Sequence, residues 1–448
     1  MIGQFFSFVI VIGVIIFIHE FGHFSMAKIF RIPVAVFSLG FGPRLFGFRH
    51  KETEYKVSAL PLGGYVKIHG MEDQEAAPDD PNSFYNRPRY QRFLVLFMGV
   101  GFNVLLAILL ITIALNRGIE VSQSSLKDSR IGAVTPGSPA DRAGLKPGDR
   151  ILEINGAKTP TWKEVMYSIL LHPEETVFVK FQREDQVLYR EIRLEKDPSR
   201  NLGRMGISSF SDVIVADVAP DSPAERAGLK REDMIRLING VAVHGPESVP
   251  RAVQQSKGKP VEIVVVRTES GHTAQRTLNI TPYLDKQTNR WMIGFVPAEP
   301  TVIKKLPVSA AFVESIRTCK EHLFLTAQFL GRLVQGKLSL KASSGPFDIA
   351  RMSQAARKTS WTTFLLFIGT ISFDIGLINL LPIPALDGGH IFFLLLEGLT
   401  RREFSIKLKE RVTMVGFAFL ICVMVVVLYY DILRTGPVQK LIESLGSH

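Results

Sequence analysis

Four long apolar stretches constrain the fold of this 448-residue chain more than any other feature. They cover residues 2–27, the 24 uncharged residues between Arg92 and Arg117, residues 360–381 with Asp374 as their single acidic residue, and residues 412–430. An α-helix needs about 20 apolar residues to cross a bilayer. The sequence therefore predicts a polytopic α-helical membrane protein with four transmembrane helices. The first stretch lacks a basic leader and a small-residue cleavage site, so we interpret it as a retained span and not as a signal peptide.

The placement of lysine and arginine orients these spans. Basic residues are concentrated between Lys28 and Arg92 and again within residues 382–411, whereas they are absent before His19 and sparse after Tyr430. Short basic segments stay on the cytoplasmic side. Both termini and the long insert at 117–359 are therefore expected on the opposite side. The formal net charge of +11 is explained by these flanks, and no nucleic-acid-binding signature accompanies it.

The insert contains an internal repeat. "SPADRAGLKPGDRILEING" (Ser138–Gly156) and "SPAERAGLKREDMIRLING" (Ser222–Gly240) match at thirteen of nineteen positions, with an offset of 84 residues. Self-similarity at this period indicates two copies of one compact domain. Each copy shows a short helix at Ser-Pro, then a strand and an Asn-Gly turn, and so resembles a PDZ domain of the bacterial envelope type. PDZ domains bind extended peptides at a sheet edge, and "RMGIS" (Arg204–Ser208) is a candidate carboxylate loop. A spacer or size filter is an equal alternative.

The first apolar stretch ends in "IHEFGH" (Ile18–His23). His19 and His23 are four residues apart, so on a helix both imidazoles can meet one metal ion. Glu20 is offset around the helix and can reach a metal-bound water. This arrangement is typical of zinc proteases. Polar groups without a shared partner at the end of an apolar span would each cost several kcal/mol, which favours a metal site.

Catalytic zinc usually takes a third protein ligand. The acidic residues near apolar spans are Asp374, Asp387 and Glu397. Asp387 lies in "NLLPIPALDGGH" (Asn379–His390), where prolines prevent a regular helix and glycines permit tight turns. Irregular backbone at membrane depth is tolerated where it lines a wet cavity, which favours Asp387. His390 remains a rival ligand or a residue in the first turn of the next helix.

These motifs together resemble the site-2 protease family of intramembrane zinc metalloproteases, most closely the bacterial regulator-of-sigma-E type. HExxH stands in the first span, N-x-x-P-x-P-x-L-D-G follows the third, and the tandem PDZ-like copies lie between the second and third. The resemblance implies that His19, His23 and Asp387 bind one zinc ion and that Glu20 is the general base. It also implies that Asn379 holds the substrate backbone or oxyanion.

Two further elements carry the same resemblance. "FSLGFGP" (Phe37–Pro43) and "LPLGGYVKI" (Leu60–Ile68) are similar to the membrane-associated β-hairpin of the family. That hairpin pairs with unwound substrate, which implies substrate contacts at four glycines: Gly40, Gly42, Gly63 and Gly64. "GVGFN" (Gly99–Asn103) is similar to the G-P-x-x-N element, with Val100 in place of proline and Asn103 as its last residue.

One residue departs from the family pattern. Asp374 stands where the family usually carries asparagine, five residues before Asn379. The change adds a carboxyl group near the expected site. It leaves three alternatives open: a protonated Asp374, competition for the metal, and altered substrate handling.

The resulting expectation is four transmembrane helices, a membrane-associated β-hairpin region, and two α+β PDZ domains inserted between the second and third spans. The expected boundaries are 1–30 for the first span, 31–92 for the hairpin region, 93–116 for the second span, 117–200 and 201–283 for the PDZ domains, 284–359 for a periplasmic amphipathic segment at the membrane surface, 360–381 for the third span, 382–411 for an active-site loop and cytoplasmic segment, 412–430 for the fourth span, and 431–448 for a periplasmic tail.

The resemblance implies hydrolysis of peptide bonds within or near transmembrane segments at the bacterial inner membrane. Expected substrates are single-span proteins such as an anti-sigma factor, and signal-peptide remnants; peptides are expected ligands of the PDZ domains. Two other classes are alternatives. A metal transporter would need a polar path on both sides of the site, yet residues 1–18 offer only Gln4 and Ser7. A non-catalytic PDZ scaffold would not need Glu20.

Overall fold

The computed structural model describes residues 2–71, 80–126, 129–269, 272–285 and 289–435. The chain divides into two compact units. The first unit comprises Met1–Ile119, Lys305–Leu333 and Ser339–His448, and the second comprises Glu120–Lys304 and Val334–Leu338. Most of the tail expected at 431–448 lies outside the described residues.

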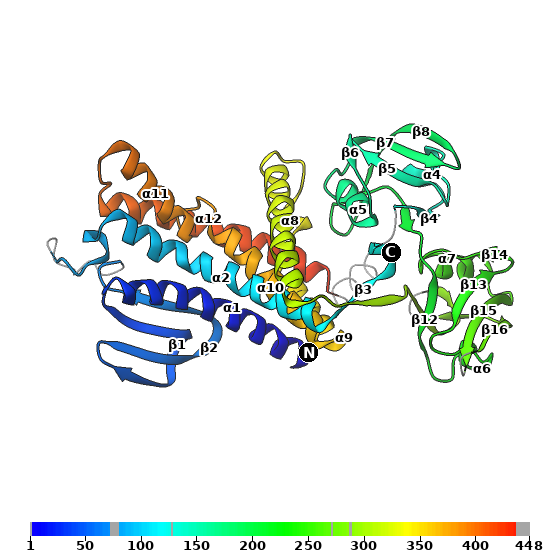
Figure 1. Ribbon diagram of the computed structural model, residues 1–448, viewed down its shortest axis with the longest axis horizontal. Helices are drawn as coiled ribbons and strands as arrows, with labels where there is room; N and C mark the ends of the chain where they lie inside the picture. Colours follow the sequence, from blue (N-terminus) through cyan, green and yellow to red (C-terminus); the bar gives the residue numbers. More distant parts are fainter. Residues whose placement is uncertain (1, 72–79, 127–128, 270–271, 286–288, 436–448) are drawn as a thin grey trace, which may run out of the picture. The chain divides into compact units, whose positions relative to one another are not determined.

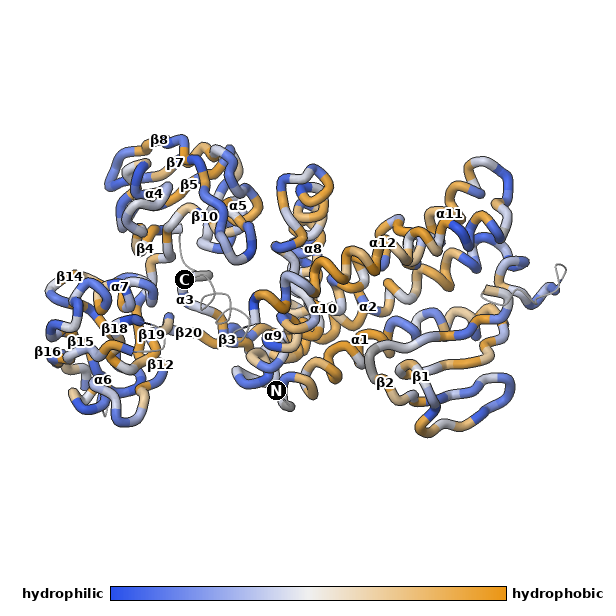
Figure 2. The backbone as a smooth tube through the Cα atoms, turned by 180° about the vertical axis from the view of Figure 1, so that it is seen from behind, coloured by the Kyte–Doolittle hydropathy of each residue, from blue (hydrophilic) through white to orange (hydrophobic). Residues whose placement is uncertain are grey.

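The first unit is a helical bundle with a long β-hairpin (Figure 1). Its elements are α1 (Ile2–Ile29), β1 (Val34–His50), β2 (Thr53–Ile68), η1 (Phe84–Asn86), α2 (Arg89–Arg117), α8 (Val308–Val334), η2 (Leu340–Ala342), α9 (Pro346–Thr359), α10 (Trp361–Asn379), α11 (Asp387–Thr400) and α12 (Ile406–Leu433). In the described part of the chain, four helices are long and apolar enough to cross a membrane: α1, α2, α10 and α12. Apolar residues run along all four in Figure 2. The structure therefore contains four candidate membrane helices, in agreement with the four apolar stretches of the sequence.

Small residues allow α1, α2 and α10 to pack closely. A Cβ added at Gly22 of α1 would lie only 2.2 Å from the carbonyl oxygen of Met98 on α2. Ser372 of α10 donates a hydrogen bond to the carbonyl oxygen of Asn103 at 3.0 Å. Close backbone approach of this kind is typical of membrane helix interfaces. It brings the end of α1 that carries the two histidines directly against α2.

The hairpin of β1 and β2 packs beside α1 and is antiparallel. Lys28 in the last turn of α1 pairs with Glu52 at the hairpin turn and donates to Thr53 Oγ1 at 2.9 Å. The opposite part of the hairpin exposes large apolar side chains, including Phe41, Leu45, Phe46 and Leu60. Large apolar side chains that are exposed together on one part of a surface favour contact with lipid or with a partner protein.

One helix lies within a range whose boundaries the sequence assigned to a loop, and it places His390 in a first helical turn, which was one of the two alternatives for that residue. Residues 387–400, assigned from the sequence to a loop and cytoplasmic segment, form α11, a helix of 14 residues. The segment after Gly389 is mostly apolar and contains no proline, so it can form a regular helix. The helix ends at Arg401, which has the left-handed backbone conformation. At about 1.5 Å per residue it is too short to cross a bilayer.

The second unit holds the two copies. Its elements are β3 (Ile119–Ser122), α3 (Gln123–Leu126), β4 (Ile131–Val134), α4 (Pro139–Arg142), β5 (Arg150–Ile154), β6 (Ala157–Lys158), α5 (Trp162–Leu170), β7 (Thr176–Arg183), β8 (Gln186–Arg193), β9 (Glu195–Lys196), β10 (Gly203–Arg204), β11 (Ile207–Ser209), β12 (Val213–Val218), α6 (Pro223–Arg226), β13 (Met234–Ile238), β14 (Val241–Ala242), α7 (Ser248–Gln255), β15 (Val261–Glu269), β16 (His272–Ile280), β17 (Tyr283–Asp285), β18 (Arg290–Met292), β19 (Phe295–Ala298) and β20 (Thr301–Lys304). Each copy has its own hydrophobic core. Both copies are α+β domains.

The copies extend further along the chain than the boundaries expected at residues 200 and 283. β11 pairs with β4 of the first copy, and β19 pairs with β12 of the second. Met205 and Ile293 are equivalent, because their carbonyl oxygens accept from the Ala140 and Ala224 N–H groups at 3.0 and 2.8 Å. The offset between equivalent residues is 84 for the alanines and 88 for this later pair, which hides the repeat in the sequence.

The residue after each of these carbonyls is a glycine. Gly206 and Gly294 have φ angles of +83° and +87°, and a Cβ at either would lie 2.2 Å from the Cβ of the serine that caps the neighbouring short helix. Only glycine fits such a position. The X-Gly-X turn before the last strand is therefore a shared structural element of the two copies.

Candidate metal centre

Three side chains that can bind a metal converge in the first unit. His19 and His23 come from α1, and Asp387 is the first residue of α11. Oδ2 of Asp387 lies 3.1 Å from Nε2 of His19 and 3.4 Å from Nε2 of His23, and the two Nε2 atoms are 3.2 Å apart. Among the described residues, this is the one group of three or more such ligands that is close enough to hold an ion.

The donor atoms fit a zinc ion. Nδ1 of His23 donates to the carbonyl oxygen of Val95 at 2.8 Å, which turns the lone pair of Nε2 toward the centre of the group. Oδ2 of Asp387 is buried and has no well-formed hydrogen bond within the described structure. Two imidazoles and one carboxylate form a usual ligand set of catalytic zinc. An ion between them would satisfy the buried oxygen.

Two residues of α2 shape the space around the imidazoles. A Cβ added at Gly99 would lie 2.3 Å from Nε2 of His23 and 3.0 Å from Cε1 of His19, so any side chain there would displace the rings. Asn103, fully buried one turn later, places its amide nitrogen 3.3 Å from Nδ1 of His19. These contacts give a physical reason for the G-V-G-F-N sequence.

Glu20 lies beside the ligand group but is not part of it. Its carboxylate accepts a hydrogen bond from the backbone of Val66 on β2. A Cβ added at Gly64 would lie 3.5 Å from Cγ of Glu20 and 2.9 Å from the carbonyl oxygen of Ser38. The hairpin backbone therefore lies next to Glu20. A larger residue at position 64 would be crowded by the Ser38 carbonyl oxygen, whereas Glu20 would lie at an ordinary contact distance.

Asn379 ends α10 and reaches the same centre, since its Nδ2 lies 3.5 Å from Nε2 of His19. The loop from Leu380 then folds tightly against the start of α11. A Cβ at Gly388 would lie 2.2 Å from the Leu380 carbonyl oxygen, and one at Gly389 would lie 2.2 Å from that of Ile383. The two glycines thus allow Asn379 and Asp387 to face the same space.

The other hairpin glycines lie apart from this contact. Gly63 is covered by the ring of Phe41, Gly40 is buried against the Leu60 carbonyl, and Gly42 is exposed with open space around it. Of the four glycines implied by the resemblance, Gly64 is the one with a neighbour in the candidate site, Glu20.

The rival acidic ligands have other partners. Asp374 forms a hydrogen bond with Thr326 and lies near His322, both on α8. Glu397 is buried and pairs with Lys409 at 2.7 Å. His390 occupies the first turn of α11 and is outside the ligand group. Of the sequence alternatives for the third ligand, Asp387 is the one the structure brings to the histidines.

Comparison with known proteins agrees with this geometry. The model of Peptidase family M50 matches residues 7–423, which includes the histidines, Glu20 and Asp387. The chain belongs to this family. This M50 peptidase is therefore an intramembrane zinc metalloprotease, and the expectation drawn from HExxH and the apolar spans is confirmed.

Relatives of this M50 peptidase carry consistent names. A Vibrio cholerae protein named as a zinc metalloprotease is 29% identical over 96% of this chain and 98% of its own. The regulator of sigma E protease of Haemophilus influenzae is 30% identical over the same shares. The regulator of sigma-E protease RseP of Salmonella typhimurium is 29% identical, again over 96% and 98%. The similarity spans nearly the whole of each chain.

Sequence reasoning missed some contributors to the centre. The Val95 carbonyl, which orients His23, has no sequence signature because any residue supplies a carbonyl group. The contact of Gly99 with the two imidazoles is not predicted by the sequence, in which Gly99 is only the first residue of the G-V-G-F-N element. Its spacing of four residues from Asn103 places both on one face of α2, and that spacing was the available signal.

Proposed function

We propose that His19, His23 and Asp387 hold a single zinc ion and that Glu20 is the general base of peptide-bond hydrolysis. The observation that carries the proposal is the convergence of three donor atoms at the end of an apolar helix. Glu20 directly follows the ligand His19 in that helix but lies outside the ligand group. A base must reach the attacking water without itself binding the metal. Glu20 lies outside the ligand group, and its place next to His19 in the chain supports its reaching that water.

The residues divide the chemistry between them. Zinc, when bound, polarises a carbonyl group and lowers the pKa of coordinated water to about 7. Glu20 takes the proton from the attacking water and passes it to the leaving amine. The amide of Asn379 donates a hydrogen bond to the carbonyl oxygen of the scissile bond.

The hairpin supplies partners for the substrate backbone. A helical substrate hides its carbonyl groups in internal hydrogen bonds and must unwind before cleavage. Pairing with the β2 edge next to Gly64 replaces those bonds by strand addition. Because Gly64 adjoins Glu20, a strand paired there runs directly past the base.

The centre lies inside the bilayer, nearer its cytoplasmic face. His23 precedes Lys28 by five residues, or roughly 7.5 Å of helix. Lys28 reaches the headgroups and pairs with Glu52 of the hairpin turn. The distribution of basic residues assigns the two PDZ-like copies and both termini to the periplasmic side of the inner membrane.

The substrates are single-span membrane proteins. The name of the Salmonella and Haemophilus relatives, regulator of sigma E protease, supports an anti-sigma factor as one substrate class. Signal-peptide remnants form a second class, since they too are single apolar helices that present one end to the aqueous phase.

Replacement of the base tests this function. Glu20→Gln keeps the shape of the side chain but removes the proton acceptor, so bound zinc should persist while cleavage falls by about 10²- to 10⁴-fold. Zinc is measured by elemental analysis of purified protein, and cleavage with a tagged single-span substrate. Glu52→Gln, which alters a carboxylate at the hairpin turn, should change neither. Cleavage by Glu20→Gln within tenfold of wild type would rule out Glu20 as the base.

A further inference from the structure

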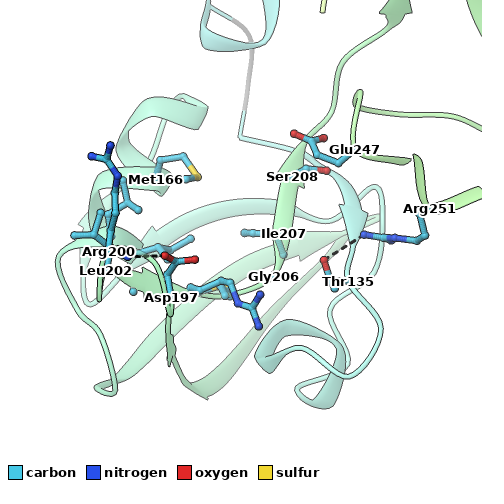
Figure 3. Close-up of a pocket in the computed structure, with 15 residues that line it drawn as sticks. Thr135, Met166, Asp197, Arg200, Leu202, Gly206, Ile207, Ser208, Glu247 and Arg251 are labelled. Carbon is cyan, nitrogen blue, oxygen red and sulfur yellow. Dashed lines mark hydrogen bonds between the residues drawn. The ribbon is translucent and has the colours of Figure 1, made fainter. Parts of the chain in front are cut away.

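Charged side chains line hollows of very different size in the described structure. One hollow, about 400 Å³, lies in the first PDZ-like copy between α5 and β11 (Figure 3). It occupies the place where the PDZ resemblance already implies a peptide, and Arg204 at its rim pairs with Glu195 at 2.9 Å. A much smaller hollow, about 20 Å³, lies in the first unit between α2, α11 and α12 and is lined by Arg92, Glu397 and Lys409. It has room for water but not for a larger ligand, so its charged groups act on one another.

Glu397 is the centre of this small cluster. Its side chain is only 1% exposed, and its Oε1 lies 2.7 Å from Nζ of Lys409 on α12 and accepts from the Phe404 N–H at 3.0 Å. Its Oε2 lies 4.0 Å from Nη1 of Arg92 on α2. Both cations are buried as well, and the ring centre of Tyr85 lies 5.0 Å from the Lys409 Nζ. One carboxylate therefore joins α11 to α2 and α12, at the end of the bundle where these three helices meet (Figure 1).

Glu397 is also the main partner of the buried Arg92 charge. Nη2 of Arg92 lies 3.5 Å from Glu403, but that side chain is 69% exposed and its charge is screened by water. Nε of Arg92 is buried and has no hydrogen-bond partner within the described residues. The guanidinium group therefore depends on the carboxylate of α11 for the balance of its charge.

The ion cluster and the metal ligand share one side of α11. The residues that follow one another at intervals of four, three and three positions, and so stay on one side of the helix, are Asp387, Ile391, Leu394 and Glu397. Ile391 packs in the same hydrophobic cluster as residues of α2. The rotation of α11 that directs Glu397 toward Arg92 is therefore also the rotation that directs Asp387 toward the histidines.

A small rotation of α11 would be enough to disturb the metal ligands. Glu397 follows Asp387 by ten residues, or roughly 15 Å of helix, and a helix of this length turns as one body. A rotation of roughly 10° moves a side-chain atom about 6 Å from the helix axis by about 1 Å. Metal–ligand distances are set to within about 0.2 Å. The carboxylate of Asp387 therefore needs a fixed α11.

Arg92 connects the same cluster to the histidine side of the centre. It precedes Val95 by three residues on α2, and the carbonyl oxygen of Val95 accepts from Nδ1 of His23 at 2.8 Å. The part of α2 that receives Glu397 is therefore the part that orients His23. One ion cluster thus relates the ligand on α11 to a ligand on α1.

Stability alone does not account for charges at this place. Replacement of a buried ion pair by apolar residues of similar volume is often neutral or stabilising, so such a pair is weak evidence for stability. Apolar surfaces can pack in several rotations, whereas buried charges are satisfied only where they meet. A buried ion cluster between α11, α2 and α12 therefore selects one rotation of α11.

We propose that Glu397 is a positioning residue for Asp387. Its ion pair with Lys409 and its contact with Arg92 fix the rotation of α11 at which Asp387 meets the two histidines of α1. This inference rests on the proposed role of Asp387 as a zinc ligand. Loss of the carboxylate at position 397 leaves α11 free to rotate, so metal affinity falls and the geometry of the bound metal changes.

Metal binding to the full-length protein in detergent tests the proposal. Zinc affinity is measured by competition with a chelator, and cobalt(II) in place of zinc reports the ligand geometry through its visible absorption. Glu397→Gln keeps the shape of the side chain but removes its charge, so it should weaken zinc binding at least fivefold and alter the cobalt spectrum. Lys409→Met, which removes the charge of the partner, should have the same effects. Glu397→Asp restores the carboxylate and should bring zinc affinity to within threefold of wild type.

Asp431→Asn is the matched control. Asp431 is a fully buried carboxylate at the other end of α12, and it accepts from the backbone N–H groups of Phe347 and Asp348 at 2.8 and 3.2 Å. Its replacement should lower the unfolding temperature, as replacement of Glu397 does, because each change removes a buried charged acceptor. Zinc affinity and the cobalt spectrum should remain those of wild type in Asp431→Asn. The comparison separates positioning of the ligand from a general loss of stability.

Wild-type zinc affinity and cobalt spectra in both Glu397→Gln and Lys409→Met would overturn the proposal, and so would an equal loss of affinity in Asp431→Asn. If Glu397→Gln does not fold, Lys409→Met decides by the same criteria, since Glu397 then keeps Arg92 as a partner. Asp387→Asn is measured in parallel. Loss of zinc in Asp387→Asn with wild-type binding in the other variants counts against this inference alone, and retention of zinc in Asp387→Asn counts against the proposed ligand set.

Discussion

The amide nitrogen of Asn103 lies 3.3 Å from Nδ1 of His19. Oδ1 of the same amide is buried without a partner in the described part of the chain. The two ends of an amide have nearly the same shape, so their assignment follows from the hydrogen bonds they make. With the amide turned, Oδ1 accepts the Nδ1–H of His19 and Nε2 is free to bind a metal. Asn103 is thereby a positioning residue for a metal ligand.

Removal of this amide should weaken zinc binding. Asn103→Leu keeps the volume but deletes the acceptor, and loss of such a partner typically lowers metal affinity by about 10- to 100-fold. Competition with a zinc chelator measures the affinity directly. Asn103→Asp, which restores an acceptor, should recover part of the loss. Asn116→Leu is the matched control on the same helix, because Asn116 bonds only the Leu306 carbonyl in this region. Equal zinc affinity in Asn103→Leu and wild type would contradict the role.

Gly99 and Gly101 offer a second matched pair on α2. Alanine at either position raises helix propensity by about 1 kcal/mol relative to glycine. At Gly99 the new Cβ meets Nε2 of His23 at 2.3 Å, whereas at Gly101 the nearest atom is the flexible Met98 sulfur at 3.3 Å. Gly99→Ala should therefore lose zinc and cleavage, and Gly101→Ala should retain both. Elemental analysis and the cleavage assay decide between these outcomes, and wild-type zinc in Gly99→Ala would contradict the contact.

The catalytic motif was accessible to sequence reasoning because its geometry is local. His19 and His23 share a helix face by spacing alone, and the four spans follow from length and composition. The third ligand was harder, since three acidic residues stood near apolar spans. Tertiary contacts distinguish these three acidic residues. Glu397 pairs with Lys409 and Asp374 faces α8, while Asp387 reaches the histidines.

The extent of the PDZ-like copies was not accessible in the same way. β11 has three residues and no readable alternation, and its partner β4 lies more than seventy residues earlier in the chain. A strand of this length is defined by its partner and not by its own pattern. The equivalence of Met205–Gly206–Ile207 and Ile293–Gly294–Phe295 became visible only from their shared contacts with the short helices.

Glu299 joins three segments of the second unit. Its carboxylate accepts hydrogen bonds from Ser122, from Ser124 at 2.5 Å and from Ser209 at 2.8 Å. Ser122 and Ser124 precede the first copy, and Ser209 lies at the junction between the copies. Burial raises the pKa of Glu299, but the serine hydroxyl donors outweigh that effect and hold the pKa below its ordinary value of 4.5.

Glu299→Gln should lower the stability of this unit by on the order of 2 kcal/mol, because bonds to a charged acceptor are lost. A carboxylate whose pKa is lower in the folded state than in the unfolded state stabilises the folded protein. This stabilisation is present at pH values above the unfolded-state pKa and is lost as the pH falls through the folded-state pKa. The difference in unfolding temperature between wild type and Glu299→Gln should therefore be largest at pH 7 and become smaller below about pH 4. Glu191→Gln, an exposed carboxylate on β8, should show no difference at either pH. A gap that widens on acidification would contradict the role of the charged form.

Asp374, the residue that departs from the family pattern, should be dispensable for the metal. It faces Thr326 and His322 on α8, and it is absent from the ligand group. Asp374→Asn keeps the hydrogen bond to Thr326 and restores the residue that the resemblance leads one to expect. Zinc content should therefore equal that of wild type, and cleavage should stay within threefold. Asp387→Asn, the same chemical change at the proposed ligand, removes the charged oxygen that lies 3.1 Å from His19 and should release the metal. Both variants are compared by elemental analysis after dialysis against a chelator. Loss of zinc in Asp374→Asn with retention in Asp387→Asn would show that the two aspartates exchange roles when the ion is bound.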